Sequence, residues 1–148
     1  MPQRLTRTIS KLPDTRAALR ALAKYHYLTI PQLQALLGLS AYNLARKALF
    51  SLWKGGFLER LILTQAARVF SYIYVFVLSR DGARQLCDSG NHRIFYLKPR
   101  DKRSTVFLEH AILINDFHIC LELLEGQHKD FQLELWKQTK QDVRVHIK

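Results

Sequence analysis

The sequence predicts an α+β fold, in which helices and a β-hairpin share a core and a long helix follows them. Between residues 14 and 54, apolar residues recur at spacings of three and four, which is typical of amphipathic helices. Two runs rich in branched and aromatic residues, 57–63 and 69–79, flank a polar turn, which is typical of an antiparallel hairpin. Hydrophobic residues make up 48% of the 148 residues, enough for a folded core.

Three helices are expected before the hairpin. Asp14 or Thr15 is a suitable cap for the first helix, whose apolar stripe faces inward. Thr29 caps a second, short helix that Gly38 ends within two turns, and Ser40 is expected to start the third after a brief break.

The third helix, which runs to Lys54, has two distinct faces. Its apolar arc, expected to face inward, is Ala41, Leu44, Ala45, Ala48, Leu49 and Leu52. The opposite arc is Tyr42, Asn43, Arg46, Lys47, Phe50, Trp53 and Lys54. A short helix, a tight turn, a longer helix with a basic outer face and then a hairpin predict a winged helix-turn-helix, whose recognition helix enters a major groove.

The chain is divided by composition into four regions. A basic N-terminal arm at 1–13 precedes a winged helix-turn-helix DNA-binding domain at 14–90, which ends with a short helix, Arg80 to Cys87, that Ser79 can cap. A basic connector follows at 91–103. Residues 104–148 are expected to form a long C-terminal helix, from Ser104 to about Glu125, and a short β-hairpin that serves dimerisation or partner binding.

The charge balance favours a polyanion as the partner. Lys and Arg number 23 against 12 Asp and Glu, which gives a formal net charge of +11. Residues 1–108 hold 18 basic and 5 acidic side chains, whereas residues 109–148 hold 5 and 7. The basic surface therefore belongs to the winged region, and double-stranded DNA is the first partner to consider.

The candidate DNA-binding residues come from the helix, the hairpin and the arm. On the helix, Arg46 and Lys47 suit guanine edges or phosphates, Asn43 suits adenine, and Tyr42 can reach a phosphate or a thymine methyl. Phe50 and Trp53 are expected to pack beneath the hairpin or the long helix instead. The remaining candidates are Lys54, the hairpin residues Arg60 and Arg68, and the arm residues Arg4 and Arg7, which suit a phosphate strand or the minor groove.

Catalysis, metal binding and cofactor binding are not expected. The chain lacks a Gly-rich phosphate loop and a nucleophile motif, and its six histidines lack paired ligand spacing. His110 is interpreted as a hydrogen-bonded core residue, and Cys87 and Cys120 as reduced, buried thiols. No run of 18 uncharged apolar residues or secretion signal is present, so we expect a cytoplasmic protein associated with nucleoid or plasmid.

Several segments resemble the plasmid replication-relaxation family. They are Leu28 to Leu33, Ala45 to Arg60, Tyr74 to Gly82, Leu108-Glu109-His110 and Asn115-Asp116, within a similarity that covers residues 12–136. The helix with His110 and Asn115-Asp116 is the part of the resemblance that is specific to this family. The resemblance implies an accessory DNA-binding protein of plasmids or integrative elements.

Three functions are compatible with these observations. The preferred one is sequence-recognising binding of double-stranded DNA, as a transcriptional regulator or as a plasmid replication and mobilisation factor that marks the origin for a relaxase. The alternative is a protein–protein interaction module, in which the winged helix docks a relaxase or replication partner. A truncated nuclease-like enzyme, using Glu134 and Asp142, is the third. The first requires Arg46 and Lys47 to be exposed beside the hairpin.

The long helix raises a question of assembly. Its apolar residues spread over far more than one stripe, so the helix must be covered on several sides. A second copy in a twofold dimer or the strands at 131–147 could provide the cover. We expect a homodimer, because the small winged module offers only one side.

Overall fold

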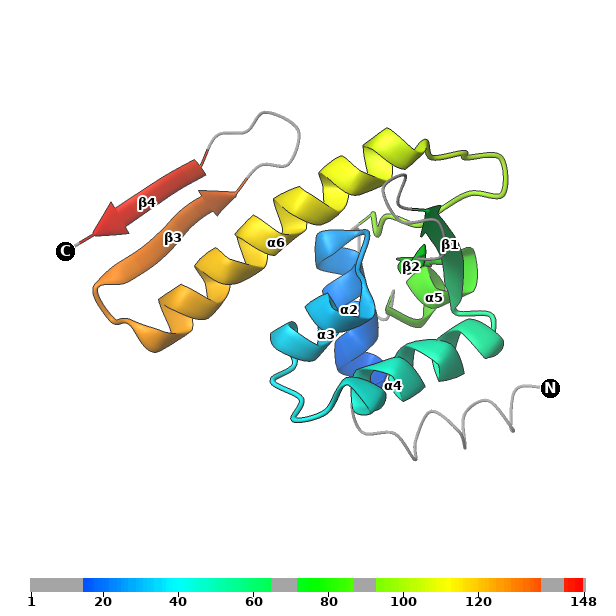
Figure 1. Ribbon diagram of the computed structural model, residues 1–148, viewed down its shortest axis with the longest axis horizontal. Helices are drawn as coiled ribbons and strands as arrows, with labels where there is room; N and C mark the ends of the chain where they lie inside the picture. The colour runs from blue at the N-terminus through cyan, green and yellow to red at the C-terminus, as the bar shows by residue number, and fades with distance from the viewer. Residues whose placement is uncertain (1–14, 65–71, 87–92, 137–142, 148) are drawn as a thin grey trace.

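The computed structural model describes residues 15–64, 72–86, 93–136 and 143–147 (Figure 1). In these residues, helices and an antiparallel hairpin precede a long C-terminal helix and a second hairpin, which confirms the α+β class. The arm expected at 1–13 lies outside the described residues. Within the described residues, no helix has the length and apolar character needed to cross a membrane.

The first helices follow their sequence signals closely. They are α2 (Thr15–Tyr25), α3 (Ile30–Leu36) and α4 (Tyr42–Lys54). Thr29 caps α3 as predicted: its Oγ1 accepts a hydrogen bond from the backbone N of Gln32, and Gln32 Oε1 accepts one from the backbone N of Thr29 at 3.0 Å. This reciprocal pair satisfies two amide groups that the first turn of a helix leaves open.

The start of α4 differs from the prediction. The helix begins at Tyr42 rather than Ser40, because Ala41 is an extended N-cap residue. The inward arc is correspondingly narrower than expected: Ala41 is exposed, and Leu44, 100° from Ala45 around the helix, is 47% exposed. The rest of the predicted arc, Ala45, Ala48, Leu49 and Leu52, is buried.

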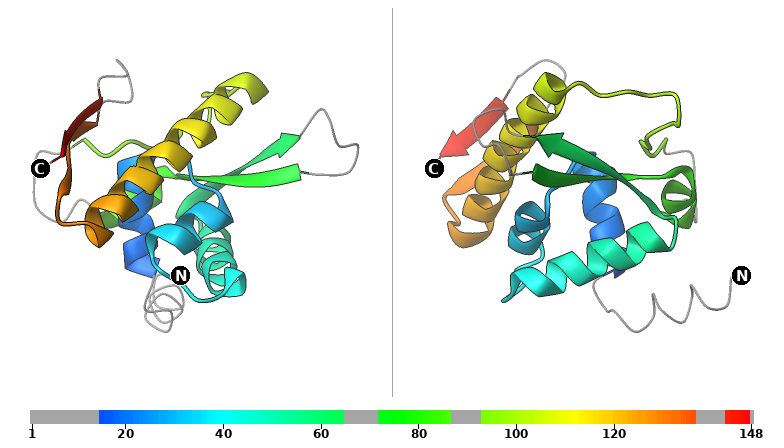
Figure 2. Two further views of the ribbon diagram at one scale, coloured as in Figure 1. Left: turned by 60° about the vertical axis from the view of Figure 1, so that its left-hand side comes forward. Right: turned by 45° about the vertical axis from the view of Figure 1, so that its right-hand side comes forward.

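The predicted hairpin is present and lies beside α4 (Figure 2). Strand β1 (Leu58–Thr64) pairs antiparallel with β2 (Tyr72–Leu78). Leu28, in the segment between α2 and α3, adds a short bridge to Phe76 through two backbone hydrogen bonds of 2.8 and 3.1 Å. The base of the hairpin is therefore tied to the helices.

Ser79 caps the next helix, α5 (Arg80–Leu86), as predicted. Its Oγ accepts a hydrogen bond from the backbone N of Gly82 at 3.2 Å and donates one to the carbonyl of Gly56 at 2.6 Å. The segment expected to be a connector then packs on the hairpin, because Leu97 is buried and its N–H bonds to the carbonyl of Leu78 at 2.9 Å.

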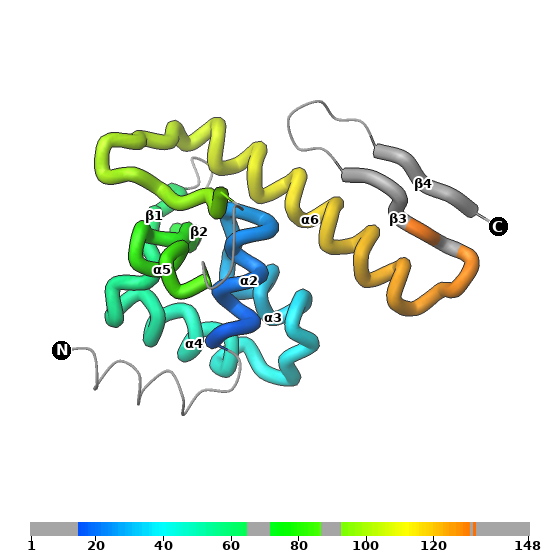
Figure 3. The backbone as a smooth tube through the Cα atoms, turned by 180° about the vertical axis from the view of Figure 1, so that it is seen from behind, coloured from blue at the N-terminus to red at the C-terminus, as the bar shows by residue number. Residues whose placement is uncertain are grey.

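The long helix α6 (Thr105–Gln127) matches the predicted span. Ser104 caps it by accepting a hydrogen bond from the backbone N of Phe107 at 3.1 Å. Strands β3 (Phe131–Trp136) and β4 (Val143–Ile147) form a second antiparallel hairpin. Helix α6 lies between the helices on one side and this hairpin on the other (Figure 1), and the view from behind shows α2 and α3 beside it (Figure 3).

One face of α6 is docked on the preceding helices and the β1–β2 hairpin. Leu108 and Ile119 are buried in their two hydrophobic clusters. The side-chain Nδ2 of Asn115, which is 2% exposed, donates to the carbonyls of Tyr25 and Tyr27 at 3.1 and 2.6 Å. The preceding helices and hairpin therefore cover one face of the long helix.

A second set of hydrogen bonds joins α6 to α3. Gln32 Nε2 donates to the carbonyl of Ile112 at 3.0 Å and to Oδ1 of Asp116 at 2.7 Å. The same Gln32 completes the cap of α3. The start of α3 and the middle of α6 are therefore held by one side chain.

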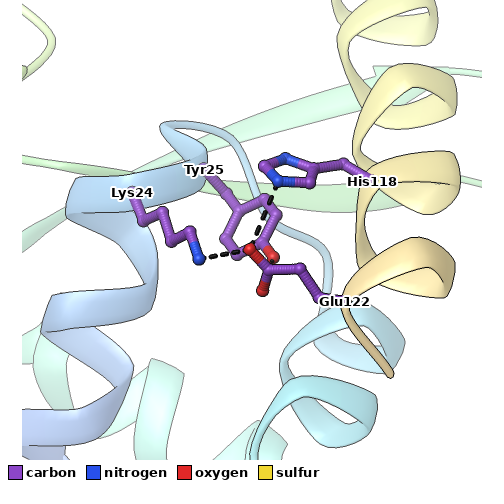
Figure 4. Close-up of polar contacts among 4 residues, drawn as sticks. All are labelled: Lys24, Tyr25, His118 and Glu122. Carbon is purple, nitrogen blue, oxygen red and sulfur yellow. Dashed lines mark hydrogen bonds and ion pairs between the residues drawn. The ribbon is translucent and has the colours of Figure 1, made fainter. Parts of the chain in front are cut away.

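A cluster of polar side chains joins α6 to α2 (Figure 4). The Glu122 carboxylate accepts hydrogen bonds from Lys24 Nζ and the Tyr25 hydroxyl, and His118 Nε2 lies 3.3 Å from it. Burial and the bond to Glu122 raise the pKa of Tyr25. Although burial opposes it, the bonds from Lys24 and Tyr25 lower the pKa of Glu122. Burial lowers the pKa of His118, which the nearby Glu122 only partly offsets.

Two interpretations of α6 are wrong. His110 is exposed and is not a core histidine; the buried one is His118, at 5% exposure. Cys120 is free and exposed rather than buried, and Cys87 lies outside the described residues. Both errors have one cause, because a helix that is apolar nearly all round does not indicate which of its faces packs inward.

Candidate nucleic-acid interface

Helix α4 carries a polar outer face on a buried apolar one. The predicted residues Tyr42, Asn43, Arg46, Lys47 and Lys54 are all exposed. Ala45, Ala48, Leu49 and Leu52 fix the helix to the core, so this outer face is held on a rigid support. Arg46 and Lys47 are thus exposed as expected, and Arg46 lines one groove with Tyr72 and Tyr74 of the hairpin.

The surroundings of this face contain little negative charge. No Asp or Glu occurs between Asp14 and Glu59, whereas the same stretch holds six Lys and Arg. Among the ion pairs within the described part of the chain, none includes Arg46, Lys47 or Lys54. The positive charge of α4 is therefore not neutralised there, as a polyanion-binding surface requires.

Aromatic rings fill the space between α4 and the hairpin. Phe50 meets Trp53, Tyr74 and Phe76 edge-on, with ring centroids 5.7–5.9 Å apart. Since such edge-to-face contacts are favourable and directional, they set the angle between helix and hairpin. The prediction that Phe50 and Trp53 pack under the hairpin is confirmed.

The two arginines of this region lie against these rings. The guanidinium carbon of Arg46 is 4.7 Å from the Phe50 centroid. That of Arg60, on β1, is 3.8 Å from the Trp53 centroid and 4.5 Å from that of Tyr74. Cation–π contacts of this kind hold a guanidinium in place while leaving its N–H groups available to an acceptor. The arrangement thus brings Arg46 and Arg60 onto one surface.

The inner face of the hairpin extends this surface beyond the predicted residues. Ile62 and Tyr72 are 56% and 57% exposed, next to Tyr74 and on the same side of the sheet as Arg60. They were missed because hydrophobic strand residues are expected to be buried. The signal that could have found them is the alternation along β1 and β2, which sends every second side chain to this face.

A groove of about 920 Å³ lies between this surface and α6. Tyr42, Arg46 and Phe50 of α4 line one side, and Asp116 of α6 lies on the other. Asp116 accepts its hydrogen bond from Gln32, so its carboxylate is held on the α6 side. The acidic side chain of the groove is thereby kept on the wall opposite α4.

Other sequence-predicted residues are not placed on this surface. Arg4, Arg7 and Arg68 lie outside the described residues. Among the residues that are described, no group of three His, Cys, Asp or Glu side chains is arranged to hold a metal ion.

The fold and this surface define a small α+β protein with a basic, aromatic-lined face formed by a helix and a hairpin. Residues 19–147 match the family described as Replication-relaxation. The chain belongs to the Replication-relaxation family, which confirms the resemblance found in its sequence. No curated protein and no solved structure matches the chain significantly.

Proposed function

We propose that this protein binds double-stranded DNA through a winged helix-turn-helix, in which α3 and α4 form the helix-turn-helix and the β1–β2 hairpin is the wing. The observation that carries the proposal is the outer face of α4, where Arg46 and Lys47 are exposed and form no ion pair with a described carboxylate, and where Arg46 lines one groove with Tyr72 and Tyr74 of the hairpin. A helix of this kind fits the major groove, and the adjoining hairpin then lies along a phosphate strand.

The residues divide by the contacts they can make. Asn43 and Arg46 carry the side chains that read base edges, adenine and guanine respectively. Lys47 and Lys54 supply point charges for phosphates, and Arg60, held by its rings, supplies a positioned one on the hairpin. This division predicts both sequence recognition and a salt-dependent component of affinity.

Family membership supports a role for this binding in plasmid replication or mobilisation. We infer that the protein acts there by marking a DNA site. Either it regulates transcription from that site, or it presents the origin to a relaxase or replication protein.

The test is a binding assay with duplexes from the DNA that flanks its own gene, repeated at several salt concentrations. We expect Arg46→Ala to weaken binding to the preferred duplex by about 1–3 kcal/mol and to reduce discrimination between duplexes. Lys47→Ala, if it contacts phosphate, weakens all duplexes alike and lowers the salt slope by about one.

Arg84→Ala is the matched control. Arg84 is an exposed arginine on α5, outside the proposed interface, and lies 3.7 Å from Asp81. Removing it changes the net charge equally but is expected to leave discrimination intact. Unchanged binding in both α4 variants would reject the DNA-recognition assignment and favour the alternative function, a winged helix that docks a relaxase or replication protein.

A further inference from the structure

A small cavity of about 280 Å³ lies between the first half of α6, the end of α2 with the segment after it, and the connector residues 93–103. The lining residues are Tyr25, His26, Tyr27, Phe95, Arg103, Phe107, His110, Ala111, Ile114 and Asn115. None of them belongs to α3, α4 or the β1–β2 hairpin. The cavity is therefore separate from the proposed DNA-binding surface.

Aromatic rings form much of the wall of this cavity. His26 stacks on Phe95, with ring centroids 4.3 Å apart and an angle of 24° between the rings. The Tyr27 centroid lies 5.8 Å from that of Phe95 and 5.4 Å from that of Phe107, which it meets edge-on. Phe107 is 43% exposed, so these contacts do not cover its whole ring. Rings from three parts of the chain thus surround one space, as a site for a flat ligand requires.

A single arginine is held among these rings. Arg103 Nε donates a hydrogen bond to the Tyr27 hydroxyl at 2.7 Å, and the guanidinium carbon lies 5.2 Å from the Phe107 centroid. None of the lining residues is acidic, and the ion pairs among the described residues do not include Arg103. Because the bond to Tyr27 uses only the Nε–H group, the terminal N–H groups of the planar guanidinium can bind an anion.

The backbone at His26 gives a second indication of a site. Its φ of 69° is in the left-handed region, which suits glycine and is rare for other residues. Non-glycine residues held in this conformation cluster at ligand-binding sites. Burial lowers the pKa of His26, so its ring is neutral at pH 7 and Arg103 supplies the permanent positive charge of the cavity.

We propose that this cavity binds a small aromatic carboxylate. The carboxylate accepts hydrogen bonds from the guanidinium of Arg103, and the ring of the ligand packs against Phe95 and Phe107. The planar guanidinium selects a carboxylate, because its N–H groups match the two oxygens. The aromatic wall selects a flat ring over a saturated one. A volume of about 280 Å³ is at the small end of ligand sites, so a single substituted ring such as benzoate fits it.

Thermal unfolding of the full chain with sodium benzoate at millimolar concentration tests the proposal without DNA. We expect Tm to rise with benzoate and then to level off, because a ligand that binds only the folded chain stabilises it. Cyclohexanecarboxylate has the same charge without the flat ring, and benzamide has the ring without the charge, so each should raise Tm much less. No rise with benzoate, or an equal rise with cyclohexanecarboxylate, overturns the proposal.

Two substitutions locate the site by isothermal titration with benzoate. Arg103→Gln should weaken binding by about tenfold or more, since it removes the charged donor, and Phe107→Leu by about threefold or more, since it removes a ring. The matched controls are Lys102→Gln, which removes the neighbouring exposed charge, and Phe117→Leu, which alters another exposed phenylalanine of α6. Neither Lys102 nor Phe117 lines the cavity, so both controls should bind as the wild type does.

The Phe107→Leu variant keeps the test valid if Arg103→Gln fails to fold, because the side chain of Phe107 is partly exposed and its replacement is also apolar. Wild-type affinity for benzoate in Phe107→Leu, or an equal loss of affinity in the controls, overturns the assignment of this cavity.

Discussion

Replacing Asn115 by Ala tests how α6 is held on the preceding helices and hairpin. The Asn115 amide donates two hydrogen bonds, at 2.6 Å to the carbonyl of Tyr27 and at 3.1 Å to that of Tyr25. Between these carbonyls lies His26, whose φ of 69° is in the left-handed region that non-glycine residues rarely adopt. The single amide therefore clamps both sides of a strained turn.

The magnitude follows from the partners that remain after the change. The carbonyl of Tyr25 keeps the hydrogen bond from the backbone N of Tyr27, at 2.9 Å, whereas that of Tyr27 loses its short bond. Leaving one buried carbonyl without a donor costs about 1–3 kcal/mol, and losing the second bond about 1 kcal/mol more. We therefore expect Asn115→Ala to lower the free energy of unfolding by about 2–4 kcal/mol, and Tm by on the order of 10 °C.

Urea unfolding followed by circular dichroism measures this change. Asn43→Ala, which truncates an exposed asparagine on α4, is the control and should alter the free energy of unfolding by less than about 0.5 kcal/mol. If Asn115→Ala proves as stable as Asn43→Ala, the clamp does not hold α6, and the reasoning from these hydrogen bonds is refuted.

Two further predictions concern packing and pH. Gly82→Ala should destabilise the folded protein by about 1–3 kcal/mol, because the added Cβ would lie 2.0 Å from the carbonyl oxygen of Phe57. Gly126→Ala places its Cβ in open space and should stabilise the folded protein by up to about 1 kcal/mol. Equal effects of the two substitutions in urea unfolding would contradict this. Burial lowers the pKa of His118 in the folded state, so folding favours its neutral form, and stability is lost as pH falls below about 6.5, its value when unfolded. His118→Gln should therefore show a smaller drop in Tm between pH 7.5 and 5.5 than the wild type. The drop that remains is expected to come from His26, because burial lowers its pKa too. Identical drops in the two proteins would argue against this role for His118.

Helix starts were the most predictable part of the fold, because the signals that set them are local. Thr29, Ser79 and Ser104 each cap a helix within a residue of the predicted position. A cap depends only on a side-chain oxygen and an amide two or three residues further on. The start of α4 was misplaced because the side chain of its N-cap, Ala41, makes no such hydrogen bond.

The candidate site was predicted on α4 but only partly on the hairpin. Arg46 and Lys47 follow from helical periodicity, which separates polar from apolar faces. The environment of Arg60 does not, since its rings come from α4 and from β2, 14 residues along the chain at Tyr74. Contacts between elements depend on packing angles that the local pattern does not specify.

Helix α6 shows where periodicity alone becomes ambiguous, and which further signal resolves it. Its residues are apolar on both faces, so the sequence indicated that cover was needed without indicating which face the chain covers itself. Asn115 marks that face, because a polar side chain in an apolar helix is buried only where partners satisfy it. The docked face is therefore set by this one amide, whose hydrogen bonds go to two carbonyls of the segment between α2 and α3.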